Sequence, residues 1–451
     1  MSAEIHQADA GSQVLTITGF HSQVLNNKRS LYIYLPRGYG LNDSMRYPVL
    51  YAHDGQNVFE PAFNGQSWDL HRVCDRLIDE GKIEPLIIVA IANMGEERSS
   101  EFAHAGSYSN LLPYPCNGEA YERFLVEEVK PFVDRLLRTK PEPEHTGLMG
   151  SSRGGLVTYH IGMRRADVFG KLAMLSPYFA QLDDKGVAHL PIAHRWTSKQ
   201  PLRIWIDAGG MEGMTVRPEH VREVVDQLLG LGYRSGEDLV YYFDPDAAHD
   251  EDAWRERVHA PLIYLFGDPG QEVLEIELSG PAEAAATGWQ ASLNPVRRYA
   301  SGFWMTDLCA KLSVDPPTAA ETAPDGSLRP RSGAEACRVR YTHAGLSAET
   351  KLRLVPELSE QVNVTILVQT PADTPDVDRL YAGLELQRVG RGRYRREAAL
   401  PRSVGYRFQI GAAGLVEAER DASGPKIRSF VADRDCEIVY EVQAWMQGKF
   451  I

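Results

Sequence analysis

The first 267 residues alternate short apolar runs with amphipathic stretches, and this alternation constrains the fold more than any other feature of the chain. The apolar runs are rich in β-branched and aromatic residues, and they are LYIYLP (31–36), YPVLYAH (47–53), LIIVAIAN (86–93), KLAMLS (171–176), LRIWIDA (202–208) and LVYYFD (239–244). Runs of this kind are typical of strands that are buried on both faces of a mostly parallel sheet. Together with the helical patterns between them, they predict an α/β domain with helices on both faces of its sheet.

The longest helical pattern lies at 119–137. In EAYERFLVEEVKPFVDRLL the apolar residues recur with the period of an α-helix. Pro131 lies inside this pattern. Because proline has no N–H group and its ring clashes with the preceding turn, the sequence predicts a kink or a break in the helix there.

The pattern changes after Gly267. Helical periodicity fades, and short strand-like segments separated by turns replace it. The stretch DPPTAAETAPDGSLRPRSG (315–333) is rich in proline and glycine and is expected to be a connection between strands. Short strands at regular spacing are typical of β-sandwiches. We therefore predict three domains, at 1–267, 268–357 and 358–451.

The net charge of the chain is −13. A nucleic-acid-binding surface needs clustered lysine and arginine, so the charge argues against a nucleic-acid partner. The densest basic run, RVGRGRYRR (388–396), is expected to be a solvated strand face or turn. The five cysteines are widely spaced and form no C-x-x-C pair, which argues against a zinc site and favours reduced thiols.

The sequence contains no segment of the kind that directs a chain into or across a membrane. The N-terminal stretch MSAEIHQADAGSQ lacks the basic region and apolar core of a secretory signal. No apolar run reaches the roughly 18 residues that a membrane span needs. We expect a cytoplasmic protein with no membrane partner, or a secreted one if a leader was removed.

One short motif in the α/β domain indicates nucleophilic chemistry. The stretch Gly150-Ser151-Ser152-Arg153-Gly154 fits the pattern G-x-S-x-G, with a strand-like segment before it and a helical pattern after it. In this pattern the serine lies on a sharp turn, and the residues two before and two after it must be small so that strand and helix can approach each other. Ser152 is therefore the candidate nucleophile, and Ser151 is a spacer.

A serine nucleophile needs a base and an acid that orients the base. In α/β-hydrolases the acid and then the histidine follow the serine along the chain. His249 lies in a polar turn after the last apolar strand of the domain and is the candidate base. Asp207 and Glu212, at the end of the preceding strand, are both candidates for the acid. All three follow predicted strands at the carboxyl end, where the sites of open α/β sheets form.

The oxyanion formed during acyl transfer needs backbone N–H donors. One is expected from Arg153, which directly follows the nucleophile. The other is expected from the turn after the strand at 47–53, where Gly55 permits a sharp bend and the N–H of Gln56 or Asn57 would donate.

Six stretches, in order along the chain, resemble the putative-esterase family of α/β-hydrolases, which includes enterobactin esterases, feruloyl esterases and S-formylglutathione hydrolases. They are VLYAHDGQNVF, the spacing of Asn93, Arg98 and Glu101, GLMGSSRGGL, LSPYF, DAGGMEG and AHDEDAW. The resemblance covers about residues 14–267 and implies an α/β-hydrolase fold and a serine esterase that requires no metal and no cofactor. It also favours Glu212 over Asp207 as the acid, because relatives carry the acid just beyond a glycine turn at a strand end.

The activity that the resemblance implies is hydrolysis of a carboxylic ester. Ser152 would attack the carbonyl, His249 would take its proton, and Glu212 would orient the imidazole. No long apolar insertion is available to act as a lid, which favours a short-chain ester. A sugar or aryl ester is the other expected substrate class. Transfer of the acyl group to an acceptor other than water, and a binding role on an inactive hydrolase scaffold, are the alternatives.

Several side chains near these motifs are candidates for contact with the small-molecule substrate. They are Asp54, Asn57, Trp68, Arg98 and Tyr178. The side chain of Arg153 has two alternative roles. It either adds charge at the oxyanion or grips an acidic substrate, or it forms a salt bridge that holds the turn to a neighbouring loop.

The two trailing regions resemble β-sandwich modules. Residues 361–447 resemble a carbohydrate-binding module of the starch-binding type, and residues 269–357 resemble an immunoglobulin-like domain. Carbohydrate-binding modules hold sugar on exposed aromatic rings, usually tryptophan, but the corresponding loop LYAGLELQRVGRGRY contains no tryptophan. We therefore expect a structural or subunit-contact role, in which the β domains could join copies of the chain into a homo-oligomer.

Overall fold

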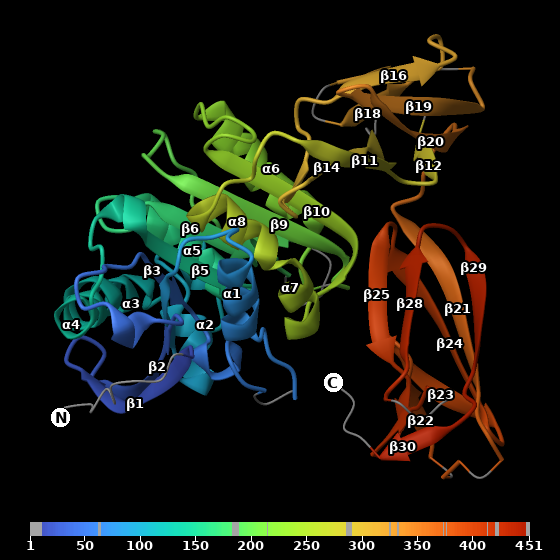
Figure 1. The fold of residues 1–451 in the computed structure, drawn as a ribbon. Coiled ribbons are helices and arrows are strands. Elements are labelled where there is room, and N and C mark those ends of the chain that lie inside the picture. The colour runs from blue at the N-terminus through green and yellow to red at the C-terminus, as the bar shows by residue number, and fades with distance from the viewer. Residues whose placement is uncertain are drawn as a thin grey trace.

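The computed structural model describes residues 11–61, 65–182, 189–213, 215–285, 291–323, 326–331, 333–372, 374–375, 377–412, 414–419 and 424–447. The first ten residues, which hold most of the N-terminal stretch considered above, lie outside the described residues. Figure 1 shows an α/β domain beside two β-regions. Of the helices within the described ranges, none is long and apolar enough to cross a membrane. All five cysteines are free thiols.

An eight-stranded sheet forms the centre of the α/β domain. Its strands, in order across the sheet, are β1 (Gln13–Ser22), β2 (Asn27–Leu35), β4 (Ile87–Ile91), β3 (Val49–Ala52), β5 (Thr146–Ser151), β6 (Lys171–Leu175), β9 (Arg203–Met211) and β10 (Leu239–Ala248). β2 pairs antiparallel with β1 and β4, and the other neighbours are parallel. β3, β4 and β5 are buried along their whole length, which explains why their sequences are apolar runs. The mostly parallel sheet predicted from those runs is confirmed.

Helices cover both faces of this sheet (Figure 1). On one face lie α3 (Gly118–Arg123), α4 (Lys130–Leu136), α5 (Arg153–Arg164) and α6 (Pro218–Gly230), and on the other α1 (Leu70–Asp79), α7 (Glu251–Arg257) and α8 (His259–Phe266). Each set of helices shares its own apolar core with the sheet. This is the α/β-hydrolase architecture expected above.

The helical pattern at 119–137 forms a continuous helix through Pro131. α3 passes directly into a π-helical segment, Phe124–Val129, and α4 follows at Lys130, with helical φ and ψ at both junctions. The predicted break is therefore wrong. The helix instead changes to π-helical hydrogen bonding directly before Pro131, whose missing N–H removes one α-helical bond.

The middle β-region, residues 273–355, contains three small sheets. Their strands, in spatial order, are β11 (Val273–Ser279), β14 (Asn294–Tyr299) and β15 (Trp304–Thr306); β12 (Glu283–Ala285), β20 (Leu346–Val355), β19 (Ala336–His343) and β16 (Lys311–Asp315); and β13 (Ala291–Ser292), β18 (Ser327–Pro330) and β17 (Ala320–Thr322). The predicted connection over 315–333 is wrong in part, because β17 and β18 lie within it and pair with each other. Both strands are too short to show a periodic pattern. Phe303 and Met305 join the core of the α/β domain beside Trp205, so the middle region packs firmly on that domain.

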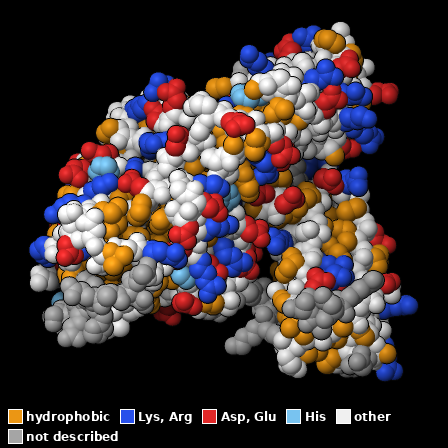
Figure 2. Space-filling model, viewed as in Figure 1, with side chains coloured by type: hydrophobic (Ala, Val, Ile, Leu, Met, Phe, Trp, Pro, Cys, Tyr) orange, Lys and Arg blue, Asp and Glu red, His pale blue; other side chains and the backbone are white. Residues whose placement is uncertain are grey.

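The C-terminal β-region, residues 361–447, is built from two sheets. The larger contains β29 (Cys436–Glu441), β21 (Gln361–Gln369), β24 (Arg393–Pro401), β23 (Glu385–Gly390), β22 (Arg379–Tyr381), β26 (Gly411–Ala412), β27 (Leu415–Glu417) and β30 (Trp445–Gln447), and the smaller contains β25 (Val404–Gln409) and β28 (Ile427–Ala432). Buried residues alternate with more exposed ones along β21, as expected for a strand with one face on a core. Apolar side chains of both sheets form that core. Figure 2 shows acidic and basic side chains interspersed over the visible face of the molecule.

Candidate active site

Ser152 lies on the sharp turn between β5 and α5. Its φ and ψ are 55° and −124°, a conformation that a non-glycine residue adopts only when the surrounding structure imposes it. A Cβ on Gly150 would meet the carbonyl carbon of Gly154 at 2.5 Å, and a Cβ on Gly154 would meet Asp54 Oδ2 at 3.1 Å. Glycine at both positions therefore lets strand, helix and neighbouring turn approach closely, which confirms the steric argument made from the motif.

The two serines of the motif have different surroundings. Ser151 is buried at the end of β5, whereas Ser152 is partly exposed. The Ser152 N–H donates to the carbonyl oxygens of Leu175 and Ser176 at 3.1 Å, which ties the turn to the end of β6. Among the hydrogen bonds of the described residues, none joins the Ser152 hydroxyl to the His249 ring. Such bonds often form only when substrate is bound.

The candidate base and the favoured acid are in contact. His249 follows β10 and Glu212 follows β9, and these two neighbouring parallel strands bring both residues to the same edge of the sheet. His249 Nδ1 lies 2.9 Å from Glu212 Oε2. The Glu212 side chain is fully buried, while that of His249 is 15 % exposed. This is the geometry in which a carboxylate fixes the tautomer and orientation of a general base.

Groups that the sequence analysis missed hold the other oxygen of Glu212. Its Oε1 accepts hydrogen bonds from the Ser176 hydroxyl and the Gly209 N–H, each at 2.5 Å, and Arg257 lies 3.9 Å away. The Ser176 hydroxyl accepts in turn from Arg257 and from the Trp254 indole. Ser176 follows β6 and Arg257 lies on α7, so the local sequence around Glu212 gave no sign of them. The stretch LSPYF, which contains Ser176, was the one available signal.

Asp207, the alternative acid, lies beneath Glu212. Its carboxylate is fully buried and accepts hydrogen bonds from the Ser176 N–H, the Arg257 guanidinium and the Trp205 indole. Burial raises the pKa of this carboxyl, against the opposing charge of Arg257. The structure therefore brings Glu212, and not Asp207, against the imidazole, and it gives Asp207 a supporting place.

The turn after β3, which is to supply the second oxyanion donor, lies beside the nucleophile turn. Asp54 has a φ of 56°, and Gly55–Asn57 form a single 3-10 turn. A Cβ on Gly55 would lie 2.8 Å from the backbone of β4, so glycine lets the turn pack against that strand. The Gln56 side chain donates to the Asn93 carbonyl oxygen and accepts from the Asn93 N–H. These two bonds fix the position of Gln56, the predicted donor.

Asp54 and Arg98 bind each other. Arg98 Nε and Nη2 lie 2.6 and 2.8 Å from the two oxygens of Asp54, and Asn93 Nδ2 donates to the same carboxylate at 2.7 Å. Burial alone would raise the pKa of Asp54, but the charge of Arg98 and the hydrogen bonds outweigh burial and lower it. The two charges neutralise each other and hold the turn that carries Gln56, and the contact of these two residues with substrate stays a prediction.

Two more residues predicted to contact substrate are buried instead. Asn57 is 5 % exposed and donates to Glu251 Oε1 at 2.6 Å. Trp68 is 4 % exposed, and its ring centroid lies 5.5 Å from that of Trp254. The Trp254 ring in turn packs edge-on against His249, at 5.2 Å between centroids. Asn57 and Trp68 are therefore held by neighbouring side chains, and their contact with substrate stays a prediction.

The side chain of Arg153 lies against two tyrosines. Its guanidinium carbon is 4.5 Å from the centroid of the Tyr178 ring and 5.1 Å from that of Tyr114, and it donates to the Tyr114 hydroxyl. No carboxylate within the described ranges pairs with it, and both alternatives for the role of its side chain stay predictions. The Arg153 N–H is the first of α5 and has no acceptor within the helix, as an oxyanion donor requires.

His53, directly before the turn at residues 54–57, is a buried and uncharged histidine. Burial lowers the pKa of its imidazole to about 4. Its Nδ1 lies 3.0 Å from the Tyr121 hydroxyl. The residue therefore packs under the turn as a neutral ring.

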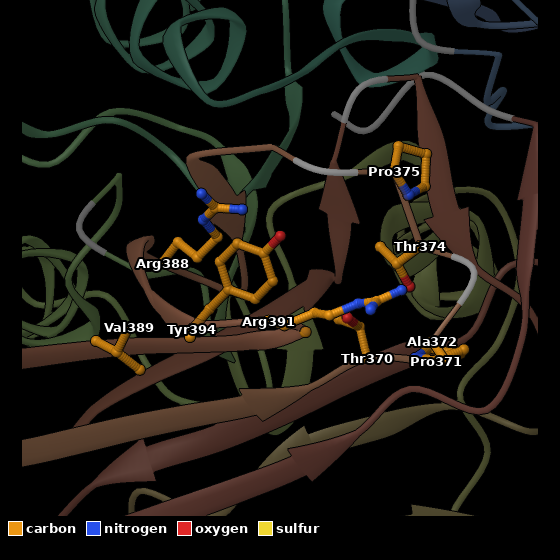
Figure 3. Close-up of a pocket in the computed structure, with 11 residues that line it drawn as sticks. Thr370, Pro371, Ala372, Thr374, Pro375, Arg388, Val389, Arg391 and Tyr394 are labelled. Atoms are coloured by element: carbon orange, nitrogen blue, oxygen red, sulfur yellow. The ribbon is translucent and has the colours of Figure 1, made fainter.

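A cavity of about 890 Å³ lies away from these turns, in the C-terminal β-region. Figure 3 shows Arg388 and Arg391 on either side of Tyr394 in this cavity. Tyr394 is buried, and its hydroxyl donates to the Val377 carbonyl oxygen, so it offers no exposed ring to a sugar. The arginines of the basic run at 388–396 are exposed on the β23–β24 hairpin, as predicted.

Comparison with known proteins finds esterases. Over 254 residues the chain is 28 % identical to an endo-1,4-β-xylanase/feruloyl esterase of Xylanibacter ruminicola, which covers 55 % of this chain and 30 % of that relative. The match thus spans less than a third of that relative's length. Two solved structures are similar at lower identity. The enterochelin esterase of Shigella flexneri is 20 % identical with a TM-score of 0.45, covering 56 % of this chain and 57 % of that one. The ferulic acid esterase of Anaeromyces mucronatus is 18 % identical with a TM-score of 0.42, covering 58 % and 92 %.

The family comparison covers more than half of the chain. Residues 22–265 match the family described as putative esterase. The matched segment contains the strands from β2 to β10, the turn at Ser152, the turn at Glu212 and His249. The chain therefore belongs to the putative-esterase family.

Proposed function

We propose that the protein is a serine carboxylic-ester hydrolase in which Ser152 is the nucleophile, His249 the general base and Glu212 the acid. Family membership supports the esterase class. The observation that carries the residue assignment is the strained turn at Ser152 together with the 2.9 Å contact between His249 and Glu212. A strained serine between strand and helix has the geometry of an exposed nucleophile, and the buried carboxylate keeps the imidazole oriented.

The proposed reaction has two steps. In the first, the Ser152 hydroxyl passes its proton to His249 while its oxygen bonds to the carbonyl carbon of the ester. The bond to the alcohol then breaks, and the alcohol leaves with the proton from His249. In the second step water adds to the acyl-enzyme by the same route and releases the acid. Glu212 stabilises the imidazolium in both steps, and the route requires no metal and no cofactor.

Two backbone N–H groups are proposed to bind the oxyanion. They belong to Arg153, at the start of α5, and to Gln56, in the turn after β3. Both turns are held by close glycine contacts and hydrogen bonds, so the donors are in place before substrate arrives. Loss of one such donor lowers turnover about 10²–10³-fold in serine hydrolases.

The surroundings of the nucleophile suggest an aryl or sugar ester as substrate. Arg153 directly follows Ser152, and its guanidinium packs against the rings of Tyr114 and Tyr178. Together these side chains offer positive charge and aromatic surface. Such surface suits an aromatic or acidic acyl group. The matched relative is named a feruloyl esterase. We therefore place feruloyl esters and short-chain sugar esters first among the candidate substrates.

The test is hydrolysis of 4-nitrophenyl acetate, 4-nitrophenyl butyrate and methyl ferulate by the purified full-length chain. Ser152→Ala should lower kcat about 10⁴-fold or more, because the nucleophile is lost. The matched control is Ser151→Ala, the buried neighbour, which should keep activity within about tenfold of the wild type. A Ser152→Ala variant as active as the wild type would exclude the proposed mechanism.

A further inference from the structure

The turn that carries Glu212, residues 209–213, is called the acid turn below. The edge of β25 covers it from outside the α/β domain. The Gly213 N–H donates to the carbonyl oxygen of Gly405 at 2.9 Å. Glu212 and Tyr406 form an isolated antiparallel bridge. In Figure 1, β25 is the part of the C-terminal β-region that faces the α/β domain. The acid turn thus receives a strand-like partner from a distant part of the chain.

The contact leaves no room for a side chain on either side of the acid turn. A Cβ on Gly405 would lie 2.3 Å from the Gly210 carbonyl oxygen and 2.6 Å from Met211 Sδ. On the opposite side, a Cβ on Gly209 would lie 2.3 Å from the Ala247 carbonyl oxygen. The turn is therefore held between the end of β10 and the edge of β25.

β25 is itself firmly fixed. Its other edge pairs with β28 along its whole length, from Val404 to Gln409. The Tyr406 ring stacks on Phe430 at 4.8 Å between centroids and belongs to the core of the C-terminal β-region. An unpaired strand edge is an exposed row of hydrogen-bonding groups, and here the acid turn covers part of that row. β25 is therefore a rigid element in contact with the turn that sets the position of Glu212.

We propose that the C-terminal β-region is part of the esterase site, with Gly405 and Tyr406 as positioning residues that act through Glu212. The inference rests on the proposed function, because it needs Glu212 as the acid. The imidazole of His249 takes its orientation from Glu212 Oε2, so a displacement of the turn is passed to the base. A misplacement of about 1 Å can lower catalysis about 10²-fold.

The experiment compares two glycine substitutions in the full chain. Gly405→Ala introduces a Cβ that clashes with the acid turn, whereas Gly424→Ala, in the same β-region, introduces one that meets no atom of the described residues within 4 Å. With 4-nitrophenyl acetate, we expect Gly405→Ala to lower kcat about tenfold to a hundredfold and to leave KM nearly unchanged, because positioning and not binding is lost. Gly424→Ala should match the wild type. In a Glu212→Gln background, Gly405→Ala should cause no further loss, because the group through which it acts is gone.

Equal kcat for Gly405→Ala and Gly424→Ala would overturn this inference and leave the triad intact. The same fold-loss in the wild-type and Glu212→Gln backgrounds would overturn it as well. An active Ser152→Ala or an unimpaired Glu212→Gln would instead overturn the proposed function, and the inference with it. If Gly405→Ala fails to fold, hydrogen exchange in the unaltered chain decides. Slow exchange of the Gly213 amide supports the contact, and exchange at the rate of a solvated amide overturns it.

Discussion

Different contacts hold the two turns on either side of Ser152 in place. The oxyanion turn, Asp54–Asn57, is held by side chains of its own domain, chiefly Arg98. The acid turn, Gly209–Gly213, is held by side chains of its own domain and also by the backbone of Gly405 in the C-terminal β-region. One turn is therefore self-contained, and the other depends on a region far along the chain.

An aspartate paired with an arginine lies at each of the two turns, and the two pairs differ in burial. The pair of Asp54 and Arg98 has side-chain exposures of 12 % and 26 %, whereas the pair of Asp207 and Arg257 has exposures of 0 % and 1 %. A buried charge that loses its partner destabilises a fold far more than an exposed one does. We therefore expect loss of the arginine to lower the free energy of unfolding most on the acid side and to lower turnover most on the oxyanion side.

The largest expected effect is on the acid side. Arg257→Met should lower the free energy of unfolding by about 3–5 kcal/mol, because it leaves Asp207 charged, buried and without its partner. The matched control is Arg255→Met on the same helix, whose ion pair with Asp252 is 36 % and 38 % exposed. This control should lose less than about 1 kcal/mol. Urea unfolding followed by tryptophan fluorescence measures both, and equal losses would contradict the difference in depth.

The next effect concerns acid sensitivity on the oxyanion side. Burial lowers the pKa of folded His53 to about 4, whereas the unfolded ring has a pKa of about 6.5. As pH falls below about 6.5, the unfolded chain takes up this proton before the folded chain does, so stability is lost until about pH 4. The loss amounts to about 3 kcal/mol. His53→Phe should remove this part of the pH dependence of unfolding, and an unchanged pH dependence would show that His53 titrates normally in the fold.

A smaller effect should distinguish turnover from stability. Arg98→Met removes the bidentate partner of Asp54, so the turn that carries Gln56 should shift and kcat should fall by about 10²-fold with little change in KM. Arg98→Lys keeps the charge but not the fork of two hydrogen bonds, and it should recover only part of the loss. Steady-state kinetics with 4-nitrophenyl acetate measures both variants. A rise in KM with kcat unchanged would instead indicate that Arg98 binds substrate.

The smallest effect concerns the side chain of Arg153. Arg153→Met should lower kcat/KM for an anionic ester, such as a 4-nitrophenyl succinate, by about tenfold more than for a neutral ester of similar size, because one charge-assisted hydrogen bond is lost. The ratio of the two kcat/KM values is the measurement. Equal losses on both esters would leave only the packing against Tyr114 and Tyr178.

The regular part of the fold could be predicted from sequence because its signals are local. All six apolar runs of the first 267 residues lie on strands of the central sheet, and Pro131 marked the place where the helix changes its hydrogen-bonding pattern. The two paired strands inside 315–333 were missed, because three or four residues are too few to show a period. The pairing of β25 with the acid turn gave no signal in either segment.

The residues of the candidate site also divide into those with a local sequence signal and those without one. The glycines around Ser152 predicted the strained turn, because the steric reason for them acts between residues close in sequence. Ser176 and Arg257 were missed, since their bonds to Glu212 join separate elements. Arg98 was found, but its pairing with Asp54 was not predicted, because nothing local shows that a charged side chain already has a partner.

The α/β architecture and the sharp turn at Ser152 could be predicted from the sequence, because each depends on local periodicity or on the size of neighbouring residues. The chain order of acid and base was instead an expectation from the order known in α/β-hydrolases. The tertiary structure showed that Asp54 and Arg98 bind each other and that the C-terminal β-region touches the acid turn, and it brought Glu212, which the family resemblance already favoured over Asp207, against His249. These outcomes depend on which distant groups share the same buried space. The hydrogen bonds and ion pairs of this space join residues that are far apart in the sequence, so they leave no periodic pattern in it.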